Sequence, residues 1–418
     1  MESGEPGPPG RKQPGTSPAH EEAGSLGSLR ESNRDRVIAT LRLLGVASRA
    51  EIARRTGLSR STVSSIVSDL RDSGLVVDRQ DGDGPVEGAG RPPALISLDP
   101  AAGYAVGIDF GKRHLAVAIA DLSHTVLAEE WREMGDGYGA EEGVGEAADL
   151  VARVLETAGA DGDRILGVGM GLPGPVHRSG TVGSGAILPG WVGVSAAEVM
   201  AARVDLPVLV ENDANLGALS EFVWGAGRGR SSIVFLKIAT GVGAGLVIDG
   251  RVFQGAGGTA GEIGHTTIDE TGDICRCGNR GCLETYAGAP ALKALLERSL
   301  GEELEPDQII ERAESGDLMC RRALADAGRH VGVAVANLCN LVNPECIVVG
   351  GSIGAAGDLL VEPLRESVRR RAIPSAAEDV EIVPARLGER AELLGAVALV
   401  LRGAGAVAGS VPAEVGAR

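Results

Sequence analysis

Apolar residues near the amino terminus recur at helical spacing. From Asn33 onward they stand three and four residues apart and give one apolar face, made of Val37, Leu41 and Leu44. Ser48 then predicts the start of a short helix, because Glu51 stands three residues later, as in a capping box. Gly57 predicts the end of that helix. The pattern indicates a small helical module.

A second short helix follows almost at once. Ser59 predicts its cap, and the apolar stripe of this helix consists of Val63, Ile66, Val67 and Leu70. Two short helices joined by a tight turn are typical of a helix-turn-helix. Two apolar runs, 75–77 and 94–98, predict a pair of strands with a Gly- and Asp-rich loop between them. Together these elements predict a winged helix.

Polar and basic side chains gather where such a module would meet DNA. The expected contacts open the second helix, start the first helix and end the loop of the wing: Arg49, Arg60, Ser61, Thr62, Ser64, Ser65 and Arg91. Arg91 is placed to enter a minor groove. The alternative is a small helical bundle whose serines and threonines only cap helices. Between Arg30 and Arg79, ten arginines stand against six acidic residues, and this basic excess favours DNA binding.

Beyond Pro100 strands and helices follow one another. Strands are expected at 104–110, 114–121, 124–132, 165–171, 207–211, 233–239, 245–248 and 346–350. Helices are expected at 145–158 and 214–224, and they dominate after residue 289. Strand runs followed by helices, twice over, predict an α/β protein with two lobes that face a cleft.

Composition limits the organisation of the chain. With 418 residues and 44% hydrophobic content, two or three domains with buried cores are expected. We expect a disordered arm at 1–29, a winged helix-turn-helix at 30–99, the two-lobed domain at 100–402 and a flexible tail at 403–418. The net charge of −17 argues against DNA binding by the chain as a whole, so only the basic module is expected to contact it. Because no run of about 18 apolar residues occurs, we expect no membrane partner and a cytoplasmic location.

One histidine and three cysteines lie close together with the spacing H-x9-C-x-C-x4-C. These residues are His265, Cys275, Cys277 and Cys282. Three thiolates and one imidazole form a closed tetrahedral set suited to structural Zn²⁺, with no position left for a metal-bound water. A knuckle that only staples a loop would explain the cluster by itself. Two carboxylates that the metal does not need, Glu262 and Glu284, suggest that the loop also forms a wall of a ligand site.

Asp213 follows a predicted strand and opens a predicted helix, which is the usual mouth of an open α/β sheet. With Asn212 before it, this carboxylate is suited to orient or deprotonate a hydroxyl. The alternative is that the Asn-Asp pair only caps the helix, and both roles are compatible. The glycine-rich stretch 240–245 offers bare backbone N–H groups for an anion, although a glycine run alone is weak evidence.

Taken together, these motifs resemble the repressor–open reading frame–kinase (ROK) family over about residues 103–401. The main motif is GEIGH followed by CxCGxxGCLE, supported by GLPGP at 171–175, LPGW at 188–191, END at 211–213, TGVGAG at 240–245 and NPECIVVGG at 343–351. The resemblance implies an actin/hexokinase-like two-lobed fold, a structural zinc and a sugar in the cleft. It also implies that the sugar hydroxyls are held by Asn212, Asp213, Glu262, His265 and Glu284. His265 would ligate zinc through one ring nitrogen and face the sugar with the other.

The winged helix in front makes the chain similar to the sugar-responsive transcriptional regulators of this family. The resemblance implies a repressor of carbohydrate uptake or catabolism genes, with a sugar or sugar phosphate as effector. Such a regulator would bind an inverted-repeat operator as a homodimer or homotetramer. One alternative is an ATP-dependent kinase for a hexose or N-acetylhexosamine with an added DNA-binding domain, in which Asp213 would be catalytic. Another is a regulator that has lost its ligand and answers to a protein partner.

A departure from the family pattern bears on that choice. Kinase members carry a DxGGT loop, whose small residues let ATP phosphates approach the backbone. Here the stretch reads Asp109-Phe110-Gly111-Lys112-Arg113-His114. Two bulky cations replace Gly and Thr and remove both the space and the hydroxyl, although a cationic pair also attracts phosphate. We therefore expect no catalytic residue, with Asp213 kept as a sugar ligand.

Overall fold

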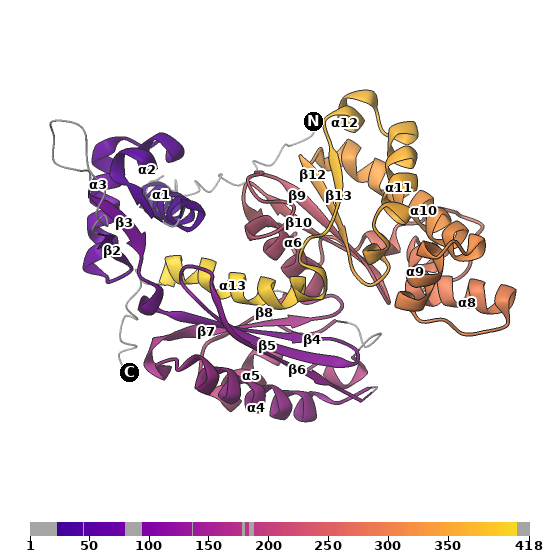
Figure 1. Cartoon of the computed structure of the whole chain (residues 1–418), viewed down its shortest axis with the longest axis horizontal. Coiled ribbons are helices and arrows are strands. Elements are labelled where there is room, and N and C mark those ends of the chain that lie inside the picture. Colours follow the sequence, from indigo (N-terminus) through magenta and orange to yellow (C-terminus); the bar gives the residue numbers. More distant parts are fainter. Residues whose placement is uncertain are drawn as a thin grey trace, which may run out of the picture. The chain divides into compact units, whose positions relative to one another are not determined.

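The structure is a computed structural model that describes residues 23–44, 46–79, 94–135, 137–177, 180–183 and 188–407 (Figure 1). The chain forms two compact units that divide between Leu98 and Asp99. Within these ranges, every helix is too short or too polar to cross a lipid bilayer.

The first unit packs its helices around a small apolar core. The hydroxyl of Ser48 accepts a hydrogen bond from the N–H of Glu51 at the start of the second helix, and Gly57, with φ 68°, ends it. The hydroxyl of Ser59 accepts a hydrogen bond from the N–H of Thr62, 3.1 Å away, and caps the third helix. The predicted helix-turn-helix is confirmed as α2 (Arg49–Thr56) and α3 (Arg60–Asp72), and α1 (Ala23–Leu44) precedes it.

A small antiparallel sheet accompanies these helices. Its strands, in the order β1-β3-β2, are β1 (Val46–Ser48), β3 (Leu95–Leu98) and β2 (Val76–Arg79). β1 was not predicted, because three residues are too few to show an alternating pattern. Helix α1 begins at Ala23, inside the stretch 1–29 that we expected to be a disordered arm. Arg91 lies in 80–93, outside the described residues, so its role stays a prediction.

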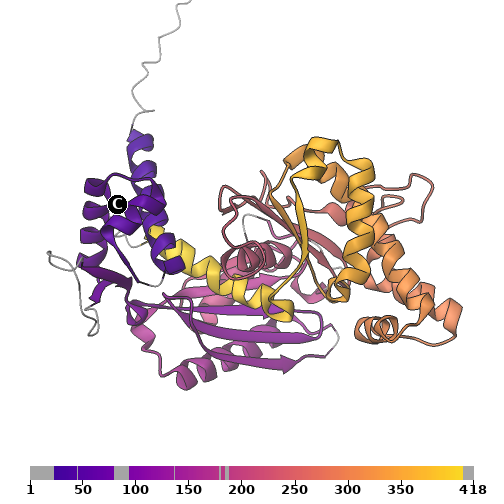
Figure 2. The same cartoon turned by 45° about the horizontal axis from the view of Figure 1, so that its top comes forward.

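The second unit contains two five-stranded sheets of the same construction (Figures 1 and 2). Each has three antiparallel strands, followed by two more strands that are added in parallel. The first sheet has the order β6-β5-β4-β7-β8: β6 (Val126–Glu133), β5 (His114–Asp121), β4 (Tyr104–Phe110), β7 (Ile165–Leu172) and β8 (Val208–Asn212). The second has the order β11-β10-β9-β12-β13: β11 (Arg251–Val252), β10 (Val242–Ile248), β9 (Ile233–Ile238), β12 (Cys346–Gly350) and β13 (Glu381–Pro384). This duplication confirms the predicted two-lobed α/β fold.

Helices pack against both sheets. On the first lie α4 (Ala140–Ala158) and α5 (Ala196–Val204). The second half carries α7 (Glu284–Ala287), α8 (Ala289–Leu300), α9 (Pro306–Glu314), α10 (Leu318–Val342), α11 (Asp358–Arg371) and α12 (Pro374–Glu378). Each half has an apolar core of its own, built mainly from Val, Leu, Ile and Ala.

Two helices cross from one half to the other. Helix α6 (Asp213–Val223) follows the first sheet but packs against β9 and β10, and α13 (Ala391–Val407) follows the second sheet but packs against β4 and β7 (Figures 1 and 2). Glycines allow this packing: a Cβ on Gly169 would lie 2.0 Å from the carbonyl oxygen of Ala396. The two helices also pack against each other and join the halves.

Several boundaries differ from the sequence prediction. β6 begins at Val126, because His124 lies in a turn with φ 69°. α4 begins at Ala140, five residues early, and β10 begins at Val242, so much of the glycine-rich stretch is strand. Helix α13 continues to Val407, beyond the expected start of a flexible tail, and β13 was not predicted.

Candidate sugar and metal site

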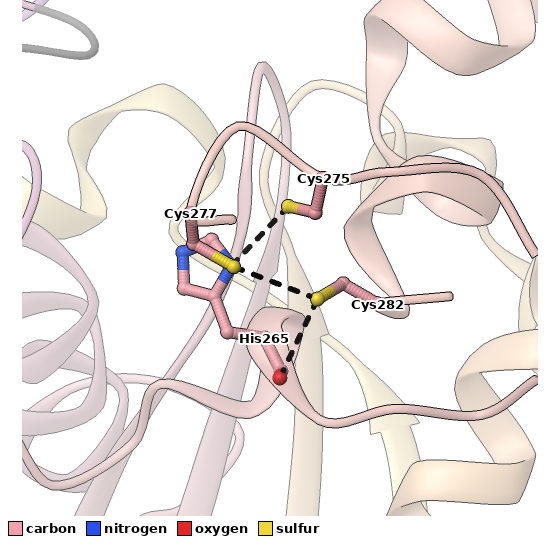
Figure 3. Close-up of side chains that lie close together, drawn as sticks. All are labelled: His265, Cys275, Cys277 and Cys282. Atoms are coloured by element: carbon pink, nitrogen blue, oxygen red, sulfur yellow. Dashed lines mark hydrogen bonds between the residues drawn. The ribbon is translucent and has the colours of Figure 1, made fainter. Parts of the chain in front are cut away.

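The histidine and cysteines of the predicted metal set lie together in the second unit (Figure 3). Their four ligand atoms are all within 4.8 Å of one another. Sγ of Cys277 is 3.7 Å from Sγ of Cys282, and Sγ of Cys275 is 3.7 Å from Nδ1 of His265. A tetrahedral ion with metal–sulfur bonds of about 2.3 Å holds its sulfurs about 3.8 Å apart, whereas a disulfide brings them to about 2.05 Å. The donor set therefore fits a single tetrahedral metal ion.

Tight turns bring the ligands together. The N–H of Gly278 donates to the carbonyl of Cys275 at 2.9 Å, and the N–H of Cys275 donates to the carbonyl of Asn279 at 2.7 Å. Gly281 has φ 65°, and a Cβ there would lie 1.6 Å from the carbonyl oxygen of Asp269. A larger residue would push the loop apart just before Cys282, so this glycine sets the position of the last sulfur.

Asn212 and Asp213 lie where β8 ends and α6 begins. The side-chain oxygen of Asn212 accepts hydrogen bonds from the N–H groups of Ala214 and Asn215, so it caps the helix. Its amide nitrogen donates to the carbonyl of Gly174 at 2.8 Å and to Oδ1 of Asp213 at 3.0 Å. The capping role is therefore real, and it also fixes the direction of the neighbouring carboxylate.

Glu262 lies next to the group formed by His265, Cys275, Cys277 and Cys282, which we call the metal-type cluster, and its charge interacts with those of two other carboxylates. His265 directs Nδ1 toward Cys275, while its Nε2 lies 3.9 Å from Oε2 of Glu262. Burial raises the pKa of Glu262, and the negative charges of Asp213 and Glu284 raise it further against the effect of His265. Glu262 therefore lies beside the cluster and within electrostatic range of Asp213 and Glu284.

Arg276 is a residue of this site that the sequence analysis missed. Its Nη2 lies 2.8 Å from Oε2 of Glu284, and its Nε lies 2.8 Å from Oε1 of the same carboxylate. The N–H of Val242 also donates to Oε2, at 3.2 Å. The position of Arg276 between the ligands Cys275 and Cys277 was the available signal.

Lys237 was missed as well, although it interrupts the otherwise apolar strand β9. Its Nζ lies 2.8 Å from Oδ2 of Asp213 and 2.8 Å from Oε1 of Glu392, at the start of α13. Burial by itself would lower the pKa of Lys237, but the carboxylates of Asp213, Glu392 and Asp109 outweigh it and raise the pKa. One ammonium group thus joins the second sheet to both crossing helices.

The turn that replaces the phosphate loop of kinases is filled by a side chain. The N–H of Gly111 donates to the carbonyl of His114, and a Cβ on Gly111 would lie 2.0 Å from the His114 ring. Nε2 of His114 is 2.9 Å from Oδ2 of Asp109, and Trp131 lies beside its ring. Burial opposes protonation of His114, but Asp109 outweighs it and raises the pKa. The Gly111 backbone is therefore already bonded and covered by His114.

Five of the seven expected DNA contacts lie on α3 in the first unit. Arg60, Ser61, Ser64 and Ser65 are exposed, and Thr62 is half-buried because its hydroxyl is 2.8 Å from that of the capping residue Ser59. Arg49, at the start of α2, is also half-buried. The apolar stripe of α3, Val63, Ile66, Val67 and Leu70, is buried on the opposite side.

A winged helix followed by a duplicated sheet-and-helix unit with a Cys₃His cluster defines a class of DNA-binding regulators built on a sugar-kinase fold. The chain belongs to the ROK family, whose sequence pattern matches residues 105–403, and residues 38–84 match the MarR family. Its winged helix places it with the transcriptional regulators of this family.

The known relatives agree with this assignment. The chain is 33% identical to the xylose repressor of Caldicellulosiruptor bescii, over 89% of this chain and 96% of that protein. A glucokinase of Thermotoga maritima is 32% identical over 71% of this chain and 96% of that protein. A crystal structure of a ROK transcriptional regulator, a homologue of the Escherichia coli Mlc protein, has a TM-score of 0.76 and 26% identity, and the match covers 91% of this chain and 98% of that one.

Proposed function

We propose that this regulator is a repressor of carbohydrate uptake or catabolism genes that a sugar releases from its operator. The sugar is held by Asn212, Asp213, Glu262, His265 and Glu284. The observation that carries the proposal is the position of Glu262, 3.9 Å from Nε2 of His265 in the metal-type cluster and within electrostatic range of the carboxylates of Asp213 and Glu284. Carboxylates suit vicinal hydroxyls, because each accepts two hydrogen bonds in one plane.

D-xylose is the first candidate effector. The support is the likeness to a protein named a xylose repressor, which extends over 89% of the chain. A neutral sugar also suits a site that holds three carboxylates, since a phosphate dianion would be repelled there. Sugar phosphates are tested beside neutral sugars for this reason.

The Cys₃His cluster is proposed to hold structural Zn²⁺. Three thiolates and one imidazole suit this ion, and the sulfur separation of 3.7 Å is that of two ligands on one tetrahedral centre. The ion would hold the loop 265–282 in shape and would keep His265 and Glu262 in place at the edge of the sugar site.

Helix α3 is proposed as the recognition helix. Its exposed Arg60, Ser61, Ser64 and Ser65, together with Thr62, Arg49 and Arg91, would contact bases and phosphates. A homodimer or homotetramer would present two such helices to an inverted repeat. Because its operator lies on the chromosome, we place the protein in the cytoplasm.

Release by sugar requires that the sugar bind the DNA-incompetent state more tightly than the DNA-bound state. A coupling of about 1–3 kcal/mol is the usual size and would weaken operator binding about 5–150-fold. Fluorescence anisotropy of DNA from upstream of carbohydrate genes, with and without D-xylose, D-glucose, N-acetyl-D-glucosamine and their phosphates, tests the proposal. Absence of specific DNA binding under every condition would sink it.

Matched variants assign the site. Asp213→Asn removes one carboxylate charge and should lower sugar affinity at least tenfold while operator binding persists. Asp149→Asn makes the same substitution at an exposed position of α4 and should change neither. Equal behaviour of the two variants would remove Asp213 from the sugar site.

The kinase alternative is tested with the same proteins. A coupled assay for ADP release over hexoses and N-acetylhexosamines should show no turnover, because the His114 ring covers the Gly111 backbone and Asp213 is paired with Lys237. Turnover that Asp213→Asn abolishes would instead make this chain an enzyme.

A further inference from the structure

Arg276 fixes the orientation of Glu284. The guanidinium makes two parallel contacts of 2.8 Å, one with each carboxylate oxygen. Two-point pairing of this kind sets the plane of a carboxylate as well as its position, which a single contact does not. The Glu284 side chain is only 12% exposed, so few other groups compete for it.

The pairing determines which lone pair can serve a ligand. A carboxylate offers about four acceptor positions. At Glu284, Arg276 uses one on each oxygen, and the N–H of Val242 uses the second on Oε2. Within the residues that the structure describes, these contacts leave one acceptor position, and it lies on Oε1. A hydroxyl that binds Glu284 without displacing Arg276 must therefore donate to this oxygen.

The backbone on both sides of Arg276 belongs to the metal-type cluster. Cys275 and Cys277 are its chain neighbours, and both sulfurs are among the four grouped ligand atoms (Figure 3). The hydrogen bonds from Gly278 to Cys275 and from Cys275 to Asn279 close the turn that carries Arg276 outward. An ion that holds both sulfurs also holds the base of this side chain.

We propose that Arg276 is a positioning residue that links metal occupancy of the Cys₃His cluster to the affinity of the sugar site, beside the direct effect of the ion on His265 and Glu262. This inference rests on the proposed function. The metal holds Cys275 and Cys277, these hold Arg276, and Arg276 orients Glu284 for one sugar hydroxyl. Loss of the metal frees Arg276, and Glu284 then loses its fixed direction.

Two substitutions of Arg276 distinguish the effect of its charge from the effect of its two-point contact with Glu284. Arg276→Gln removes the charge and the fork, whereas Arg276→Lys keeps the charge but cannot contact both oxygens in parallel. Arg280→Gln is the matched control, because Arg280 lies in the same loop but donates to the carbonyl of Gly272 and has no described contact with Glu284.

The test is isothermal titration calorimetry of the full chain with D-xylose, or with D-glucose if D-xylose is silent, alongside zinc content by elemental analysis. Both Arg276 variants should retain one zinc per chain and bind the sugar at least tenfold more weakly, while Arg280→Gln stays within about twofold of the parent. Removal of zinc with a chelator should weaken the parent at least tenfold and Arg276→Gln by a clearly smaller factor, because in the variant only the supports of His265 and Glu262 remain to be lost.

Each other result contradicts the inference. Sugar affinity within twofold of the parent in both Arg276 variants shows that the guanidinium positions nothing. Loss of zinc from both variants shows that Arg276 supports the metal loop instead of the carboxylate. If zinc removal lowers the sugar affinity of the parent and of Arg276→Gln by the same factor, Arg276 does not link the metal to the sugar site. If the parent binds none of the sugars, the proposed function fails first, and this inference fails with it.

Discussion

Replacing Lys237 with methionine should destabilise the second unit strongly. The ammonium lies 2.8 Å from both Asp213 and Glu392, and the three side chains are 24%, 14% and 8% exposed. Methionine fills much of the same volume but leaves two acidic groups, with Asp109 nearby, without their counter-charge. The surrounding protein screens these charges far less than water does.

The size of the effect follows from this burial. Removing one partner of a buried ion pair costs about 3–5 kcal/mol, because an uncompensated charge stays behind. For a unit of this size, each kcal/mol lowers the melting temperature by about 2–3 °C, so a fall of roughly 6–15 °C is expected. Differential scanning calorimetry or circular dichroism at pH 8 measures it.

The pH dependence gives a second signature. Burial raises the pKa of Glu392, and Asp109 adds to this, while Lys237 lowers it. Without Lys237 the folded variant should hold a proton on Glu392 well above the unfolded pKa of about 4.3. Stability from such a raised pKa is fully present below the unfolded value and is lost as pH rises through the folded value. The deficit of Lys237→Met should therefore be smaller at pH 5 than at pH 8.

Two further variants complete the test. Lys293→Met is the control, because Lys293 pairs with the exposed residues Glu303 and Glu305, and such pairs contribute only about 0–1 kcal/mol. Adding Glu392→Gln to Lys237→Met should recover part of the lost stability. A Lys237→Met protein that melts within 2 °C of the Lys293→Met protein at pH 8 would refute the reasoning.

Three other predictions address the metal, the DNA and the crossing helices. Cys277→Ser should lower both zinc content by elemental analysis and the melting temperature, and a zinc-free parent of normal stability would contradict the zinc assignment. Arg60→Ala should weaken operator binding in gel shifts by about 1–3 kcal/mol and leave sugar binding intact, whereas loss of both would indicate misfolding. Gly169→Ala should cost about 1–3 kcal/mol in urea unfolding, because its Cβ would meet the carbonyl of Ala396; unchanged stability would show that α13 can shift away.

Local signals made the first unit predictable. The caps at Ser48 and Ser59 and the left-handed Gly57 act within a few residues, so the sequence indicates them directly. The metal-type cluster could also be predicted from the sequence, because its four ligands lie close together along the chain. The three-residue strand β1 was not, since so short a pairing depends on the partner strand and not on its own pattern.

Long-range features could not be derived in this way. Helix α13 is buried on several sides, so its Gly-, Ala- and Val-rich sequence lacks the polar face that marks a surface helix, and we expected part of it to be a tail. The partners of Lys237 are Asp213 and Glu392, which only the folded chain brings together. The spacing of the cysteines was enough to identify Cys275 as a metal ligand. The role of Arg276 depends on its contact with Glu284, eight residues later, and the spacing of residues in the sequence does not show that contact.

The exchange of α6 and α13 between the halves has a consequence for synthesis. The first sheet has all its strands once Asn212 has been made, yet the helix that covers β4 and β7 begins only at Ala391. A nascent chain must therefore leave that apolar sheet face uncovered until the residues from Ala391 onward have been made, and chaperones should bind it during this interval. A premature stop codon shortly before Ala391 would therefore destabilise the first half of the second unit, because the sheet face formed by β4 and β7 would stay exposed.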